Sequence, residues 1–492
     1  MKRANSLALT LAALLAACSG DAPVVDTRIE GACVATTEAV RVLPSAPNFW
    51  TVGSVGVLGE YTLVVTYDWY EGMTPQERLV RFAWLNGALE YVVPWTELGR
   101  GRNFYPSRFV REGNALIAWM PLVGETEAIP SVEKTLALYR LTPDGRVTRD
   151  GFELPVTTYR FPGCAEATCN WSPLDLGGGG GLFSRGFAPI VVTPFGWTGV
   201  FGGIPSECDS GTSNLQRTIL FGSPGARVLD WNTESCLVFG PGHVGSVDHN
   251  NMNLALLSGG DLGIVFRIGG AMGSGHLHFV RADAATLEPK TAPVNVGRGG
   301  GYQVLFDSGW EPDVAPTSDD GLLFSERTDD DADRCDVLRR VRADGSSGFT
   351  AWQLPCYQNR FGLYTRESEL VPLSAGRFAV AWNERTGFGP TLDYVTRLTT
   401  SKPWREGIYL TMLTSDALRG SEVVTVTPPE ATGLDATPRT AESGPWPNEM
   451  AFTAASDGDD VAVMWRDLRA DAPGVYVRRF SCTATPADAG VR

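Results

Sequence analysis

Lysine and histidine are scarce in this chain of 492 residues, and the shortage limits what the protein can bind. There are only four lysines and four histidines, and 56 Asp plus Glu outnumber 41 Lys plus Arg, for a formal net charge of −15. Binding to nucleic acid depends on a basic face that neutralises phosphates. We therefore expect no nucleic-acid partner.

Several motifs of catalysis and cofactor binding are missing as well. The chain has no CxxC pair, no GxSxG nucleophile elbow and no Walker loop, and its glycine runs at 177–181 and 299–301 do not join a strand to a helix. The acidic run 328–336 has Arg334 and Arg340 where a calcium loop needs glycine and an acidic residue. We expect no cofactor, with a transition metal at the histidines described below as the alternative.

Long apolar runs are absent, apart from a short one at the amino terminus. Lys2 and Arg3 precede a mostly apolar run from Leu7 to Ala17, which is too short to span a bilayer as a helix. Small residues then lead into Cys18 in the segment Leu15-Ala16-Ala17-Cys18. This pattern predicts a signal peptide over residues 1–17.

The segment Leu15-Ala16-Ala17-Cys18 resembles the lipobox of bacterial lipoproteins. The resemblance implies that Cys18 becomes the first residue, receives a diacylglycerol and a further acyl chain such as palmitate, and anchors the protein to a membrane. In lipoproteins that resemble this one, a residue such as Ser19 after the cysteine points to the outer membrane of a diderm bacterium. A plain secretory signal with an incidental cysteine is the alternative.

Eight cysteines remain when Cys18 is set aside. An even number in an exported chain suggests four disulfides, whereas zinc at cysteine is disfavoured by the missing CxxC. The pairs that we predict are Cys33–Cys482, Cys164–Cys169, Cys208–Cys236 and Cys335–Cys356. The first would join the two ends of the folded domain, and the other three would order long loops.

An internal repeat is the strongest structural signal in the chain. Seven segments alternate apolar and other residues and end in an aromatic residue, at Tyr67, Trp119, Phe201, Phe266, Phe324, Trp382 and Trp465. A second strand-like segment and a tight turn follow each copy, and helical periodicity is scarce. Seven units of four antiparallel strands predict an all-β fold, a seven-bladed β-propeller. Tandem immunoglobulin sandwiches and parallel β-solenoids have other periods.

The last repeat has room for three strands only, over 449–454, 460–466 and 474–481. Residues 33–42 can supply the fourth, outer strand, which would place Cys33 beside Cys482. The predicted organisation is a signal peptide at 1–17, a tether at 18–31, the propeller at 32–483 and a disordered tail at 484–492.

The strand order assigns the loops to two faces. Tight turns join first to second and third to fourth strands on one face, and long loops such as 205–215 and 386–407 lie on the other. Long loops on a rigid scaffold are where binding residues usually lie. Tryptophans that we place in these loops are candidates for stacking on sugars or anchoring a protein: Trp69, Trp95, Trp171, Trp310, Trp404 and Trp446. For each of them, sealing the junction between blades is the alternative role.

All four histidines fall between His243 and His278, within one repeat. We place His249 in the loop that enters the first strand and His276 at the start of the third, with His278 on the same side of the sheet. His249, His276 and His278 are the candidate metal ligands, although the first and third strands of a sheet lie ~10 Å apart. Ordinary packing and hydrogen bonding are the alternative.

Carboxylates recur at the end of the second strand in four repeats: Asp68, Glu326, Glu384 and Asp467. A pair of carboxylates on one rim can hydrolyse glycosides. A residue that recurs in repeat after repeat is more simply a structural ion pair, and this is our prediction.

The sequence thus predicts a lipid-anchored envelope protein that uses its long-loop face to bind a polysaccharide or a protein partner. The alternative is a propeller hydrolase or lyase acting on carbohydrate, with the histidine cluster or a carboxylate pair as its site. No catalytic residue can be named from the sequence.

Overall fold

The computed structural model describes residues 31–44, 50–69, 77–102, 108–122, 136–151, 171–173, 189–205, 217–223, 225–229, 248–269, 276–298, 313–329, 333–353, 357–358, 368–386, 405–414, 420–428, 452–467 and 471–483. Within these ranges the regular structure is β-strand, except for one 3-10 turn at Ser374–Gly376. The strands form seven separate antiparallel sheets.

Sheets 1 to 4 follow one another along the chain. Sheet 1 contains β3 (Trp50–Leu58), β4 (Tyr61–Trp69), β5 (Glu77–Leu85) and β6 (Tyr91–Arg102). Sheet 2 contains β7 (Val110–Glu112), β8 (Ala115–Pro121), β9 (Leu136–Leu141) and β10 (Val147–Gly151). Sheet 3 contains β11 (Trp171–Pro173), β12 (Ile190–Thr193), β13 (Gly196–Pro205), β14 (Arg217–Gly222) and β15 (Gly225–Leu229). Sheet 4 contains β16 (Asp248–Leu256), β17 (Leu262–Gly269), β18 (His276–Ala282) and β19 (Val294–Arg298).

Sheets 5 to 7 complete the series. Sheet 5 contains β20 (Val314–Pro316), β21 (Leu322–Asp329), β22 (Asp333–Val341), β23 (Ser347–Gln353) and β24 (Tyr357–Gln358). Sheet 6 contains β25 (Ser368–Pro372), β26 (Phe378–Thr386), β27 (Arg405–Leu413) and β28 (Val424–Thr425). Sheet 7 contains β29 (Phe452–Asp457), β30 (Asp460–Asp467) and β31 (Gly474–Thr483), together with β1 (Ala32–Ala35) and β2 (Val40–Pro44) from the other end of the chain.

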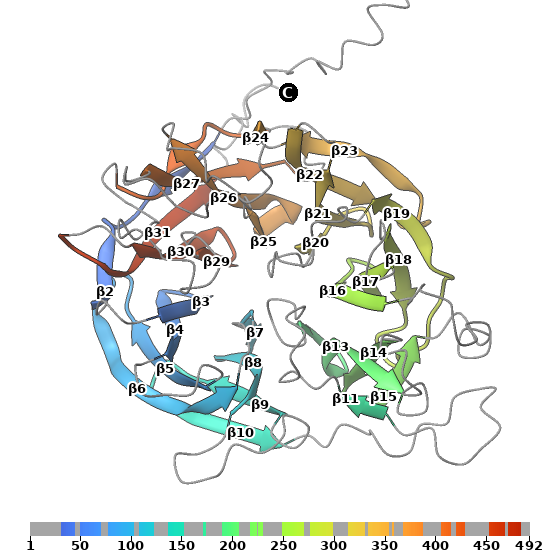
Figure 1. Ribbon diagram of the computed structural model, residues 1–492, viewed down its shortest axis with the longest axis horizontal. Coiled ribbons are helices and arrows are strands. Elements are labelled where there is room, and N and C mark those ends of the chain that lie inside the picture. Colours follow the sequence, from blue (N-terminus) through green and yellow to red (C-terminus); the bar gives the residue numbers. More distant parts are fainter. Residues whose placement is uncertain are drawn as a thin grey trace, which may run out of the picture.

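The seven sheets surround a common centre (Figure 1). First strands such as β3, β16, β25 and β29 lie nearest to it, and outer strands such as β6, β19 and β23 lie farthest away. Each sheet contacts the next one along the chain, and sheet 7 contacts sheet 1 through β29 and β3. Sheets 3, 5 and 7 have five strands where four are expected, because two short strands share the side of one longer partner in each of them.

The repeated aromatic residues form the core between the sheets. Six of the seven have described side chains, and all six are at most 3% exposed: Tyr67, Trp119, Phe266, Phe324, Trp382 and Trp465. Apolar clusters join six neighbouring pairs of sheets. Between sheets 2 and 3, the rings of Trp119 and Trp197 pack edge-on with their centroids 4.9 Å apart. Burying one such side chain is worth roughly 2 to 3 kcal/mol. The repeat is therefore a packing unit.

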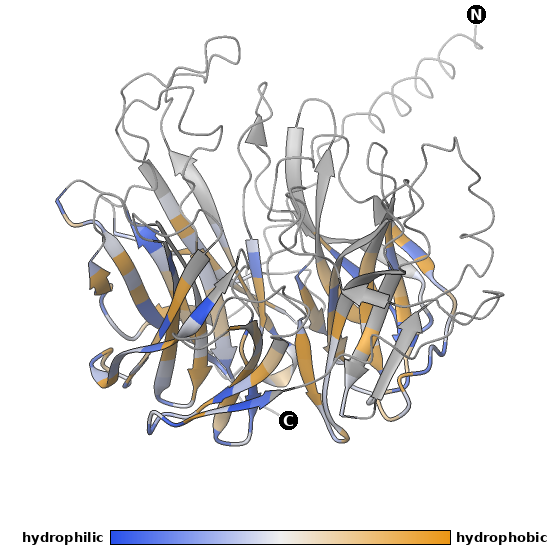
Figure 2. Ribbon diagram, turned by 60° about the horizontal axis from the view of Figure 1, so that its bottom comes forward, coloured by the Kyte–Doolittle hydropathy of each residue, from blue (hydrophilic) through white to orange (hydrophobic). Residues whose placement is uncertain are grey.

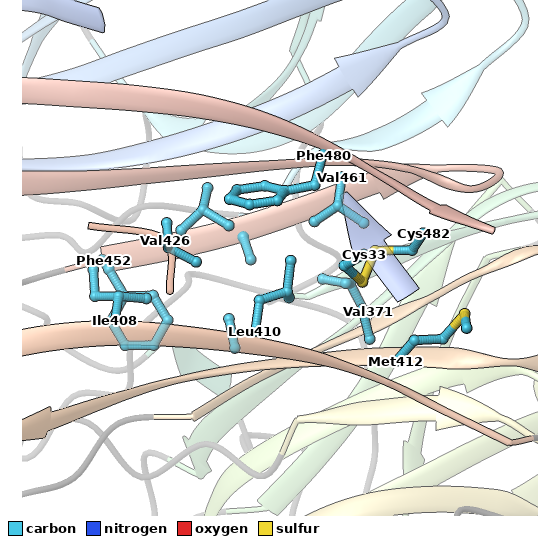
Figure 3. Packing of buried hydrophobic residues seen from close by; sticks show 14 of the residues in the cluster. Cys33, Val371, Ile408, Leu410, Met412, Val426, Phe452, Val461, Phe480 and Cys482 are labelled. Carbon is cyan, nitrogen blue, oxygen red and sulfur yellow. A yellow bond between two sulfur atoms is a disulfide. The ribbon is translucent and has the colours of Figure 1, made fainter. Parts of the chain in front are cut away.

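The two ends of the domain meet in sheet 7, as the sequence predicts. β1 and β2 both pair with β31, and Cys33 stands opposite Cys482 in the register and is bonded to it. Both cysteines are fully buried, among apolar residues of sheets 6 and 7 such as Leu410 and Phe480 (Figure 3). The predicted outer strand over 33–42 is interrupted, because the Thr37 hydroxyl accepts the Arg479 N–H at 3.0 Å in place of a ladder carbonyl.

Tight turns of one geometry define the face that we call the short-turn face. In six of these turns, a backbone N–H donates to the carbonyl four residues ahead, as from Asn86 to Glu90, Thr142 to Arg146 and Leu257 to Asp261. All six join first to second or third to fourth strands. Figure 2 shows polar residues at such turns and apolar residues along the strands. The opposite face, where second strands lead to third strands and one sheet leads to the next, is the long-loop face.

Candidate functional site

Three charged side chains from three different sheets meet near the centre. Arg108 precedes β7 in sheet 2, Asp313 precedes β20 in sheet 5, and Glu369 is the second residue of β25 in sheet 6. The Arg108 Nη2 donates to Glu369 Oε2 at 2.6 Å and also to Asp313 Oδ1. Arg108 is 205 and 261 residues away from these two partners. We call these three residues the axial cluster.

The axial cluster also satisfies the inner edge of sheet 6. β25 pairs only with β26, so the backbone groups on its other side need partners from elsewhere. Asp313 Oδ2 accepts the Leu370 N–H at 2.7 Å, and the Leu370 carbonyl accepts a hydrogen bond from Arg108 Nη1 at 3.4 Å. A side chain of sheet 5 and one of sheet 2 thus hold the first strand of sheet 6.

Charge and exposure are unevenly divided within the axial cluster. The side chain of Arg108 is 34% exposed, whereas those of Asp313 and Glu369 are 10% and 12% exposed. Burial lowers the pKa of Arg108, but the charges of Asp313 and Glu369 and their hydrogen bonds outweigh it and raise that pKa above the ordinary value. In the axial cluster one guanidinium thus faces two well-buried carboxylates.

The position of the axial cluster along the strands assigns it to a face. All three residues lie at or just before the start of a first strand, and each first strand ends in a tight turn to the second. The starts of the first strands therefore point away from the short-turn face. The axial cluster lies on the side of the long-loop face.

None of these three residues stood out in the sequence, although a signal for two of them was present. Asp313 opens the segment DVAP and Glu369 opens the segment ELVP, so that both acids occupy equivalent places in consecutive repeats. The partner, Arg108, lies three repeats earlier. Nothing in its local sequence connects it to the two acids.

The predicted metal ligands lie in sheet 4. His249 is in β16 rather than in the entering loop, and both His249 and His276 stand opposite Ile268, on the two sides of β17. Two strand spacings separate them by ~9.6 Å at the backbone. His278 stacks on the buried ring of Phe266 at 6.2 Å. Within the described residues no three His, Cys, Asp or Glu side chains are grouped to hold a metal, and the side chains of His249 and His276 lie outside them.

Of the recurring carboxylates, Asp68 forms the predicted kind of structural ion pair. Its side chain is fully buried. It accepts a hydrogen bond from Nε of Arg81, on the neighbouring strand β5, at 2.7 Å, and another from the Thr66 hydroxyl at 3.2 Å. Arg81 also lies over the Trp95 ring at 5.8 Å. Asp467 is buried too, at the end of β30. The side chains of Glu326 and Glu384 lie outside the described residues.

Three of the candidate tryptophans lie in strands instead of loops. Trp95 is in the outer strand β6, where its indole N–H donates to the Val42 carbonyl at 2.9 Å and so joins sheet 1 to β2. Trp69 ends β4 and Trp171 begins β11, and their side chains are outside the described residues. Trp310, Trp404 and Trp446 fall in undescribed segments. Trp95 thus has the sealing role that was the alternative for it.

The remaining predictions fall on parts that the structure leaves undescribed. These are Cys18 with residues 1–17, the tail at 484–492, and Cys164, Cys169, Cys208, Cys236 and Cys356. Cys335 lies in β22, but its side chain is not described. The described part of the chain contains no helix with the length and apolar character needed to cross a membrane.

Comparisons with known proteins name no family. No family model matches the chain, and no curated protein matches it. Among solved structures, a protein of unknown function from Dyadobacter fermentans is similar over 92% of this chain and 99% of its own, at 11% identity and a TM-score of 0.40. A sialidase from Trypanosoma rangeli matches over 91% of this chain and 58% of its own, at 10% identity and a TM-score of 0.36. An ulvan lyase matches over 67% and 75%, at 10% identity and a TM-score of 0.36. No function is transferred from them.

Proposed function

We propose that the protein is a lipid-anchored envelope protein whose seven sheets are the blades of one closed β-propeller. The contact of each sheet with the next, and of sheet 7 with sheet 1, supports closure, as does the Cys33–Cys482 bond. The lipobox ending at Cys18 supports acylation and attachment to the outer membrane. An unbroken ring gives the first strands a shared axis.

The propeller binds a polysaccharide of the cell envelope at the mouth of this axis, on the long-loop face. The observation that carries this function is the axial cluster, in which three repeats contribute one polar group each to one place. Carboxylates that are held in place by a guanidinium are preorganised acceptors for the hydroxyl groups of a sugar. The net charge of −15 favours a neutral glycan over an anionic one.

Binding to envelope glycans tests this function. The probes are two uncharged polysaccharides of the cell envelope, a neutral O-polysaccharide and a neutral capsular polysaccharide, titrated by calorimetry into the oxidised protein. We expect Glu369→Gln to weaken binding by about tenfold, since it removes one charged acceptor worth ~1.4 kcal/mol or more. The matched control is Glu422→Gln, the same change at an exposed position just before β28, the outer strand of the same sheet. Equal affinity of both variants and the parent, or no binding of either probe, contradicts the proposal.

Hydrolysis of carbohydrate is the second candidate, favoured by the nearness of two well-buried carboxylates, Asp313 and Glu369, to one nitrogen. A glycosidase needs one carboxyl that carries a proton and one that does not. Arg108 donates to both carboxylates and can accept no proton, so this arrangement suits binding better. Release of new reducing ends from the same glycans, lost in Glu369→Gln, would reverse the ranking.

A further inference from the structure

The amino-terminal strand enters the fold at the short-turn face. β1 begins at Ala32, which stands opposite Thr483, near the end of β31. The Cys482 N–H next to it donates to the Asp459 carbonyl at 2.8 Å, in the tight turn between β29 and β30. Any chain that precedes Ala32 therefore leaves the domain at the edge of the short-turn face.

The number of residues before β1 limits how the disc can lie relative to an acylated Cys18. Thirteen residues, 19–31, separate Cys18 from Ala32, and they reach at most ~45 Å. β31 has 10 residues and so extends over ~33 Å between the two faces. If the long-loop face were turned toward the membrane, residues 19–31 would have to run the length of β31 along the edge of sheet 7. That path would use about three quarters of their ~45 Å reach.

The charges of the short-turn face are compatible with a nearby lipid surface. Four of its carboxylates are paired with bases: Asp457 with Arg111 at 2.7 Å, Asp459 with Arg377 at 2.9 Å, Asp320 with Arg281 at 2.6 Å and Asp261 with Lys290 at 2.5 Å. These pairs reduce the repulsion between this face and anionic head groups.

We infer that the short-turn face is the surface turned toward the membrane, with the lipid bilayer as its partner, and that the long-loop face with the axial cluster is presented away from it. The inference rests on the proposed acylation of Cys18. It gives the anchored protein a defined orientation, in which the proposed glycan site is open to the compartment beyond the membrane surface.

Energy transfer to the bilayer measures this orientation. One donor dye is attached at Ala88→Cys, an exposed position in the turn between β5 and β6, and in a second variant at Asp471→Cys, an exposed position between β30 and β31. The full chain is purified from membranes, labelled without reductant and reconstituted in vesicles of phosphatidylethanolamine and phosphatidylglycerol that carry an acceptor lipid. The parent chain, treated in the same way, serves as the control for dye attached to its native cysteines.

We expect the donor at position 88 to transfer energy about twofold or more better than the donor at position 471, since the thickness of the sheet separates them by ~33 Å. Equal transfer, or better transfer from position 471, overturns the orientation and leaves the proposed anchor intact. The intact mass of the same protein reports the acyl chains separately. A Cys18 without lipid overturns the anchor and the orientation together.

Discussion

Two regions of the molecule hold buried charge, and they differ in which parts of the chain they join. Among described residues, the buried charged side chains are Asp68, Asp313, Arg466, Asp467 and Arg479. Four of these lie in sheets 1 and 7, where the last repeat meets the first, and we call this region the terminal junction. Only Asp313 belongs to the axial cluster. The terminal junction joins neighbouring sheets, whereas the axial cluster joins sheets that are up to four repeats apart.

At the terminal junction Asp68 is paired with the side chains of Arg81 and Thr66, whereas Arg479 is paired with backbone groups of sheet 1. Arg479 of β31 donates to the Gly59 carbonyl at 2.9 Å and to the Glu60 carbonyl in the first turn of sheet 1. The Gly59 N–H donates in return to Asp457 of sheet 7 at 2.7 Å. Burial lowers the pKa of Arg479. These contacts leave little for a ligand to displace.

The axial cluster is paired both through side chains of three sheets and through the backbone of Leu370, and the side chain of Arg108 is 34% exposed. We expect charge at the terminal junction to act on the stability of the fold alone, and charge at the axis to act on the proposed glycan binding as well. Four changes test this comparison.

Loss of the disulfide has the largest expected effect. The variant Cys33→Ser with Cys482→Ser is expected to lose about 5 kcal/mol of unfolding free energy, because the bond closes a loop of 449 residues. Chemical denaturation of the oxidised parent and the oxidised variant measures the loss. Glycan affinity is expected to stay unchanged. A loss below about 1 kcal/mol would show that the other contacts of sheet 7 hold the ends without it.

Removal of the Asp68 carboxylate should have the next largest effect. Asp68→Ala is expected to cost about 3 kcal/mol, because it leaves Arg81 without its buried partner. Arg81→Met should cost less when Asp68→Ala is already present, and a double-mutant cycle measures this coupling. Additive losses would mean that the two side chains do not act as a pair.

Removal of the Arg108 charge should distinguish the two regions by its effect on glycan binding. Arg108→Met keeps the apolar stem but releases Asp313 and Glu369 to repel one another, at a cost of about 1 to 2 kcal/mol. We expect glycan binding to fall by about tenfold or more, in contrast to the disulfide variant. A variant that loses stability but binds as the parent does would assign the axial cluster to the fold alone.

The smallest effect concerns a turn that belongs to neither region. The Thr286 N–H, Lys290 and the Ala285 N–H lower the pKa of Asp283 from 3.8 to about 2. Since the folded-state value is the lower one, ionised Asp283 stabilises the fold above pH 4, and this contribution disappears between about pH 4 and pH 2. In the Asp283→Asn variant, the free energy of unfolding should depend less steeply on pH in that window only. A slope reduced equally at pH 5 to 7 would point to another group.

The sequence predicted most of the fold because packing repeats with the repeat. The recurring aromatic residues predicted seven similar units. The last unit lacks a fourth strand, and this gap predicted that the amino-terminal strand completes it and that Cys33 pairs with Cys482. The sequence also placed the lipobox, which stays a prediction. It placed Trp95 in a loop, whereas Trp95 lies in β6, an outer strand of 12 residues.

Local sequence determined the strands, the turns and the buried face of each sheet, because alternation and turn chemistry act over a few residues. Only the tertiary structure decided which polar groups come into contact. Arg108 contacts Asp313 and Glu369 because the successive sheets curve around a common centre. Spacing along the chain carries no record of that curvature. The candidate site therefore depends on how the seven sheets are arranged, and the strands around it depend on the repeat.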